Sequence, residues 1–141
     1  MQIPSEKQQE YFGAGSLARL DEVLEREKPS SIFLVTGKNS YRQCGAQKVL
    51  EPLLHPYLVT LFSDFSVNPQ IEDVKRGIRL FRQKRCDLVI AVGGGSAIDM
   101  GKSVSFLAAQ PEEPEKYIRK EIVAVHEPKP LVVVPTTAGT G

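Results

Sequence analysis

A short apolar run, Leu88–Val92, leads directly into three glycines and a serine at positions 93–96. Such a run, rich in β-branched residues, is typical of a strand that is buried on both faces. The glycines permit a tight turn and a close ligand, since no Cβ stands in the way. We expect a helix to follow as far as about Ala109, with Ser96 as its cap and Asp99 completing a capping box. This order predicts a phosphate-binding turn at a helix N-terminus.

Similar apolar runs alternate with segments of helical periodicity along the rest of the chain. Further strands are predicted at Ile32–Thr36, Tyr57–Phe62 and Leu131–Val134, with a short edge strand near the N-terminus. Helices are predicted over residues 16–28 and 41–54 and from Asn68, which would cap its helix ahead of Pro69. The proline-rich segment 110–130 is interpreted as a surface excursion with one short helix.

Buried strands that are joined by helices pair in parallel, and helices then cover both faces of the sheet. The pattern therefore predicts an α/β fold with a Rossmann-like parallel sheet. The length of 141 residues indicates a single domain over residues 1–141.

Composition excludes several classes of protein. The chain has 18 Lys and Arg against 17 Asp and Glu, so its net charge of +1 gives no field that attracts nucleic acid or an anionic membrane. No apolar run approaches the roughly 18–20 residues of a transmembrane helix, and residues 1–7 lack the apolar core of a signal peptide. Cys44 and Cys86 do not form a CxxC pair, so we expect reduced thiols and a cytoplasmic protein.

A second candidate loop, PTTAGTG at residues 135–141, follows the last predicted strand. The carboxyl ends of parallel strands meet at one edge of a sheet, so this loop would lie beside the glycine turn. Its hydroxyl residues Thr136, Thr137 and Thr140 are interleaved with small residues and can hydrogen-bond a ligand over a close backbone.

A third loop, Gly37–Ser40, follows the first long strand. Where a dinucleotide binds, an acidic residue near such a position holds a ribose 2′-hydroxyl. Gly37 stands there instead, followed by Lys38, Asn39 and Ser40. An acid would repel a 2′-phosphate, whereas Lys38 and the Ser40 hydroxyl can help to bind one.

The succession of GGGSAID at residues 93–99 and PTTAGTG at 135–141 resembles the N-terminal half of the iron-containing (group III) alcohol dehydrogenases. FGAGSL at residues 12–17 and the Asn68–Pro69 pair fit the same pattern, so the resemblance covers nearly the whole chain. It implies the cofactor domain of an oxidoreductase that transfers a hydride between NAD(P)H and an alcohol/aldehyde pair. A metal, iron or another divalent ion, would polarise the carbonyl oxygen. We also expect a homo-oligomer.

The resemblance also implies which residues bind the cofactor. Gly94, Gly95 and Ser96 would hold the pyrophosphate, and Asp99 and Asn68 would lie near the nicotinamide. Thr136, Thr137 and Thr140 would line the cleft. Family members that prefer NAD often carry an acid at the position of Gly37, so the expected cofactor is NADP, with NAD as the alternative.

One departure concerns the metal. In the family the motif PTTAGTG continues with Ser-Glu, and one Asp and three His of a helical C-terminal domain bind the metal, whereas this chain stops at Gly141. His55 and His126 cannot supply such a site. We therefore expect a truncated chain that has no catalytic residue or metal ligand of its own and is inactive alone.

Two alternatives remain open at this point. A dehydroquinate-synthase-like lyase domain shares the broad architecture and the glycine turn, although PTTAGTG favours the alcohol dehydrogenases. A non-enzymatic module that binds a phosphate or a sugar phosphate would use the same turn. No residue of the chain identifies a substrate.

Overall fold

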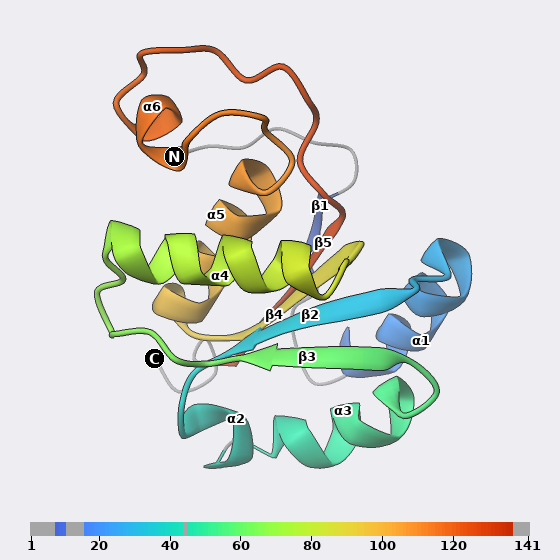
Figure 1. The fold of residues 1–141 in the computed structure, drawn as a ribbon. Helices are drawn as coiled ribbons and strands as arrows, with labels where there is room; N and C mark the ends of the chain where they lie inside the picture. Colours follow the sequence, from blue (N-terminus) through green and yellow to red (C-terminus); the bar gives the residue numbers. More distant parts are fainter. Residues whose placement is uncertain (1–7, 11–15, 44, 137–141) are drawn as a thin grey trace.

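Five parallel strands form one sheet in the computed structural model, which describes residues 8–10, 16–43 and 45–136 (Figure 1). The strands are β1 (Gln8–Glu10), β2 (Ser31–Thr36), β3 (Leu58–Phe62), β4 (Leu88–Gly93) and β5 (Leu131–Pro135). Their order across the sheet is β1-β5-β4-β2-β3, and every neighbouring pair runs parallel. The predicted Rossmann-like α/β fold is confirmed, including the short edge strand.

Helices lie on both faces of this sheet (Figure 1). One face carries α1 (Ser16–Glu27), α2 (Ser40–Gln43) and α3 (Ala46–Leu54). The other carries α4 (Ile71–Gln83) and α5 (Gly95–Leu107). A short helix, α6 (Pro114–Ile118), lies within the predicted surface excursion. None of the described helices is long and apolar enough to cross a membrane.

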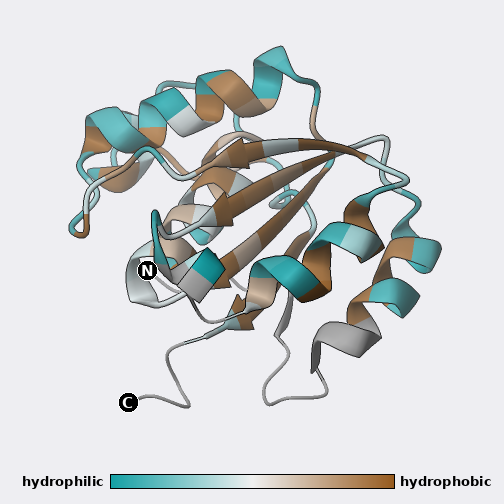
Figure 2. Cartoon of the chain, turned by 90° about the horizontal axis from the view of Figure 1, so that it is seen from below, coloured by the Kyte–Doolittle hydropathy of each residue, from teal (hydrophilic) through white to brown (hydrophobic). Residues whose placement is uncertain are grey.

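Strand β4 contributes to the hydrophobic core on both of its faces. Val89 and Ala91 pack towards α4 and α5, whereas Leu88, Ile90 and Val92 pack towards α1 and α3. All five are at most 1% exposed, and Figure 2 shows the central strands as a nearly continuous apolar layer. Burying a Val, Leu or Ile side chain contributes roughly 1.5–3 kcal/mol. The sheet is therefore assembled around this strand.

Strand β3 is not covered on both faces. The prediction that helices bury every strand of the sheet was wrong for this one strand. Leu58 is 73% exposed and Leu61 is 52% exposed, although both belong to an apolar run. The reason is position: β3 pairs only with β2 and forms one edge of the sheet. An apolar run therefore identified the strand but did not indicate how deeply it is buried.

The helix expected over 41–54 is two helices, α2 and α3. Gly45 between them has a φ of +83°, a left-handed conformation that only glycine adopts at little cost. This left-handed residue interrupts the helical hydrogen bonding and separates α2 from α3. The apolar periodicity of the sequence continues across the interruption, so it did not reveal that there are two helices.

The start of α4 also differs from the prediction. The helix begins at Ile71 with Gln70 as its N-cap, two residues after Asn68. The Asp73 carboxylate accepts a hydrogen bond from the Gln70 backbone N–H at 2.8 Å. This bond satisfies a donor just outside the first turn, so Asp73 rather than Asn68 fixes where the helix begins.

A buried amide anchors the surface excursion at residues 110–130. Gln110 is 2% exposed, and its Oε1 accepts hydrogen bonds from the N–H groups of Val125 and His126 at 3.0 and 3.1 Å. Its Nε2 donates to the His126 carbonyl at 2.7 Å. Arg82 of α4 donates to the Gln110 carbonyl at 2.9 Å. One glutamine thus holds a long connection against the domain.

We expect Gly101→Ala to destabilise the chain, because the new Cβ would lie 2.6 Å from the Cβ of Ala91 in β4. Overpacking of this kind costs about 1–3 kcal/mol. The matched control is Gly95→Ala in the same helix, where an added Cβ meets no atom within 4 Å. Urea unfolding measures both free energies. A Gly101→Ala chain as stable as Gly95→Ala would refute the close contact.

Candidate functional site

Three strand ends lie side by side at the carboxyl edge of the sheet. The register pairs Thr36 of β2 with Val92, and Gly93 of β4 with Pro135 of β5. The chain leaves β2 towards α2 on one face and leaves β4 towards α5 on the other. A crevice for a ligand forms where neighbouring strands of a parallel sheet send their connections to opposite faces. The predicted loops at 37–40, 93–96 and 135–136 follow these three ends.

The turn between β4 and α5 has a backbone that requires glycine. Gly93 has a φ of +149°, which residues with a Cβ rarely adopt. Gly94 is extended and is the N-cap of α5, so the helix begins at Gly95. The first N–H groups of a helix have no partner within it and, with the helix dipole, favour an anion. A Cβ on Gly95 would meet no atom within 4 Å, so among the described residues the space beside Gly95 is open.

The expected capping role of Ser96 and Asp99 was wrong. The helix starts before Ser96, and no side chain caps it. The Ser96 hydroxyl instead donates a hydrogen bond to the carbonyl of Val67, in the connection between β3 and α4. Asp99 is exposed on the first turns of α5. Ser96 therefore links the glycine turn to a segment 29 residues earlier in the chain.

Thr136 carries an unsatisfied hydroxyl beside this turn. Its N–H donates to the Gly93 carbonyl at 3.0 Å, which continues the pairing of β4 and β5. Its Oγ1 is buried and has no hydrogen-bond partner among the described residues. A buried hydroxyl without a partner costs about 1–3 kcal/mol, which a ligand atom can recover. Thr137 and Thr140 lie outside the described residues.

The loop after β2 is more exposed. Gly37 is half-buried, whereas Lys38 and Asn39 are exposed, and Ser40 is the first residue of α2. Gly37 does not adopt a left-handed conformation, so a side chain at this position brings no backbone strain. Beside the end of β2 the structure therefore places Lys38 and, at position 37, a glycine instead of an acidic residue.

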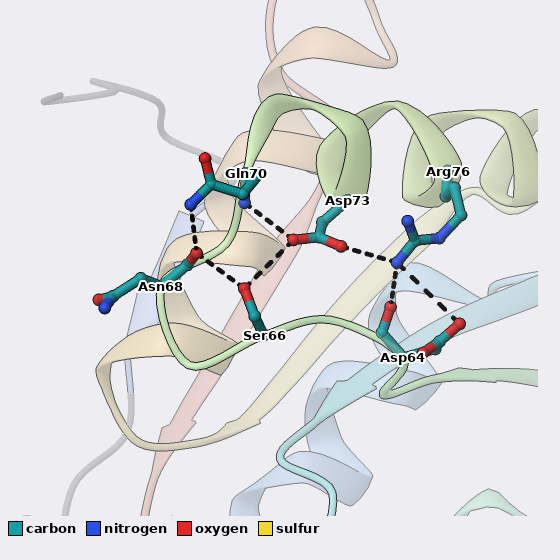
Figure 3. A network of polar contacts seen from close by, with 6 residues as sticks. All are labelled: Asp64, Ser66, Asn68, Gln70, Asp73 and Arg76. Carbon is teal, nitrogen blue, oxygen red and sulfur yellow. Dashed lines mark hydrogen bonds and ion pairs between the residues drawn. The ribbon is translucent and has the colours of Figure 1, made fainter.

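Asn68 lies in the connection between β3 and α4, close to a set of polar contacts (Figure 3). Its carbonyl accepts hydrogen bonds from Ser66 Oγ at 2.7 Å and from Gln70 Nε2 at 3.0 Å. Its side-chain amide points away from these contacts (Figure 3). The Ser96–Val67 bond brings this connection next to the glycine turn.

Asp73 is the ionised centre of these contacts. Its Oδ1 accepts a hydrogen bond from Arg76 at 2.7 Å. The hydrogen bond from the Gln70 N–H lowers the pKa of the Asp73 carboxyl, partial burial opposes this, and the Arg76 guanidinium lowers it further. Asp73 was not among the predicted site residues. An acidic residue three positions after the N-cap is a capping-box signal that could have found it.

The described residues contain no site for iron. Within residues 8–10, 16–43 and 45–136, no three His, Cys, Asp or Glu side chains gather so that they could hold a metal ion. Cys86 is buried, and burial raises the pKa of its thiol, which favours the neutral form over a metal-binding thiolate. No reaction step through a metal can therefore be built on these residues.

Comparisons with known proteins agree on one family. A family model described as "Iron-containing alcohol dehydrogenase" matches residues 8–141. The long-chain primary alcohol dehydrogenase AdhA of Thermoanaerobacter ethanolicus is 30% identical over 136 residues, which cover 93% of this chain and 34% of that protein. The lactaldehyde reductase of Escherichia coli is 32% identical over 133 residues, which cover 92% of this chain and 35% of that protein.

A solved structure shows the same fold. The sulfoacetaldehyde reductase from Bifidobacterium kashiwanohense, crystallised in complex with NAD+, matches with a TM-score of 0.78 at 24% identity. The match covers 96% of this chain and 36% of that chain. The chain therefore spans about a third of the length of the relatives it matches.

We expect Asp73→Asn to lower the stability of the chain at neutral pH, because the amide loses the charge that Arg76 and the Gln70 N–H stabilise. The pKa of Asp73 is lowered in the folded chain. The ionised form therefore adds stability above the unfolded pKa of about 3.9, and this stability is lost as the pH falls through the lower folded value.

The difference in urea midpoint between Asp73→Asn and the unmodified chain should thus be largest near neutral pH and shrink as the pH falls below the unfolded pKa of about 3.9. Glu112→Gln is a suitable control, because its exposed pair with Lys116 contributes little. A difference that stays constant with pH would show that the charge of Asp73 does not stabilise the fold.

Proposed function

This chain belongs to the iron-containing alcohol dehydrogenase family, and on that basis we propose that it binds a nicotinamide dinucleotide across the carboxyl ends of β2, β4 and β5. The observation that carries the proposal is the glycine turn at the start of α5, with free space at Gly95 and the unpartnered Thr136 hydroxyl beside it. An open backbone cradle and an unsatisfied buried donor are what a bound pyrophosphate requires.

In this proposal, the backbone N–H groups of Gly94, Gly95 and Ser96 bind the pyrophosphate. The Thr136 hydroxyl donates a hydrogen bond to a cofactor oxygen, and Gly37 leaves room for the adenosine ribose. We propose the same cleft for Asn68, Thr137 and Thr140, with Asp99 near its rim. When bound, the reduced dinucleotide would donate a hydride to the substrate, and the oxidised dinucleotide would accept one.

The proposed activity of the whole protein is the interconversion of an alcohol and an aldehyde, because the relatives of this chain are alcohol and aldehyde oxidoreductases. The described residues do not fit the family's iron, and in this proposal they supply none of its ligands. We therefore expect the 141-residue chain to bind dinucleotide but not to catalyse hydride transfer by itself.

The test is a titration of the chain with NADPH, NADH, inorganic phosphate and AMP, followed by thermal unfolding. A ligand at about 100 times its Kd adds roughly 2.7 kcal/mol of stability. We expect both dinucleotides to stabilise the chain more than phosphate or AMP does. Stabilisation by inorganic phosphate that equals the effect of NADH would instead favour the phosphate-binding module.

We expect the chain to prefer NADPH and Gly37→Asp to remove that preference. A carboxylate after β2 would repel the 2′-phosphate and accept a hydrogen bond from a 2′-hydroxyl. The Kd for NADPH should rise by about tenfold or more, while the Kd for NADH stays equal or falls. Gly37→Asn is the control of matched size without charge. Equal affinities of the unmodified chain for both dinucleotides would refute the NADP preference.

Thr136→Val should have opposite effects on stability and on binding. The variant removes a buried hydroxyl that lacks a partner, so the ligand-free chain should be as stable as the unmodified one or more stable. The Kd for the dinucleotide should rise about three- to tenfold, the value of one hydrogen bond. Thr136→Ser, which keeps the hydroxyl, should bind normally. Unchanged binding by Thr136→Val would remove Thr136 from the site.

A further inference from the structure

The connection between β3 and α4, residues 63–70, is held from the side of α4 by one carboxylate. Asp73 accepts hydrogen bonds from the Gln70 N–H at 2.8 Å and from Arg76 at 2.7 Å. The same guanidinium nitrogen of Arg76 donates to the Asp64 carbonyl at 2.6 Å. Figure 3 shows that Asp73 and Arg76 together join the beginning and the end of the connection.

The middle of the connection is fixed by its own side chains. Ser66 Oγ donates to the Asn68 carbonyl at 2.7 Å and lies 3.4 Å from the Asp73 carboxylate. Gln70 Nε2 donates to the same carbonyl at 3.0 Å. These bonds occupy polar groups that face Asp73, whereas the Asn68 amide points the other way (Figure 3).

The opposite side of the connection is held from α5. The Ser96 hydroxyl donates to the Val67 carbonyl. A hydroxyl has one proton to donate, so while this bond exists Ser96 Oγ cannot donate to a phosphate oxygen. Phosphate at the turn would then be bound by backbone N–H groups alone. The side chain of Val67, the residue whose carbonyl Ser96 contacts, is 81% exposed.

We propose that Asp73 and Ser96 are positioning residues that hold residues 63–70 as one wall of the dinucleotide cleft, and that the Ser96 hydroxyl serves this wall instead of binding phosphate. The inference rests on the proposed function, because it assumes that a dinucleotide occupies the turn. The wall presents Val67 and the Asn68 amide, which suit an apolar ring face and a polar edge of the ligand. It goes beyond the glycine turn by assigning a task to two side chains, those of Asp73 and Ser96, that need not touch the ligand.

The test compares two ligands, of which both bind the glycine turn through a pyrophosphate but only one reaches the wall. Calorimetry gives the Kd of inorganic pyrophosphate and of the dinucleotide, NADH or NADPH, whichever binds the unmodified chain more tightly. Ser96→Ala and Asp73→Asn should each raise the Kd of the dinucleotide about fivefold. The Kd of pyrophosphate should change by less than about twofold, because backbone N–H groups bind it.

Three further variants separate positioning from general stability. Glu115→Gln is the matched control: it also changes a carboxyl to an amide opposite a cation of α4, Lys75, at 3.0 Å. It should leave the ratio of the two Kd values unchanged. Ser96→Thr, which keeps a hydroxyl, should restore dinucleotide binding. The double variant with Ser96→Ala and Asp73→Asn should bind no more weakly than the weaker single variant, since both act on one wall.

Each outcome decides the inference. A parallel loss of pyrophosphate and dinucleotide affinity in Ser96→Ala would overturn it, because the hydroxyl would then bind phosphate. Unchanged dinucleotide affinity in Ser96→Ala and Asp73→Asn would overturn it as well. These results leave the proposed function intact, because the unmodified chain still binds the dinucleotide. Failure of the unmodified chain to bind either dinucleotide would overturn both.

Discussion

The structure depends on the burial of β4 on both of its faces. Alternate residues of Leu88–Val92 belong to two separate hydrophobic clusters, so the strand must lie in the interior of the sheet with helices above and below. Parallel pairing with β2 and β5 follows, since each strand is separated from the next by a helix. The glycine turn follows the carboxyl end of this strand, and Thr136 lies beside it at the end of β5.

The candidate site is a consequence of how the chain leaves its central strands. β2 and β4 are neighbours whose connections turn to opposite faces, and parallel sheets commonly bind ligands at such a reversal. Gly93 adopts the positive φ that the turn requires. Thr136, which follows β5, has a buried hydroxyl beside the turn without a hydrogen-bond partner among the described residues. The relatives that the chain matches are about three times as long. The described residues contain a glycine turn at the start of a helix, and no group of three His, Cys, Asp or Glu among them could hold a metal ion.

The polar contacts around Asp73 show how a surface connection acquires a fixed shape. One carboxylate receives a backbone N–H and a guanidinium, and that guanidinium reaches back to the Asp64 carbonyl. Ser96 then ties the same connection to the turn after β4. The connection is also anchored in the hydrophobic core by Phe65, which is 7% exposed and contacts the ring of Phe62. The hydrogen bonds hold the exposed residues on either side of this aromatic anchor.

The strands, the approximate extent of the helices and the glycine turn could be predicted from the residues alone, because apolar periodicity and glycine content are local properties of the chain. The sequence also indicated the family, through two motifs that follow neighbouring strands. Three features could be seen only in the folded chain: α4 begins after Gln70, Ser96 donates a hydrogen bond to Val67, and β3 is an exposed edge strand. The start of α4 was mispredicted because two local capping signals compete, those of Asn68 and Asp73. The Ser96 bond and the exposure of β3 depend on residues that are distant in the sequence. Periodicity identifies an element, but long-range packing decides where it ends and what its polar side chains bind.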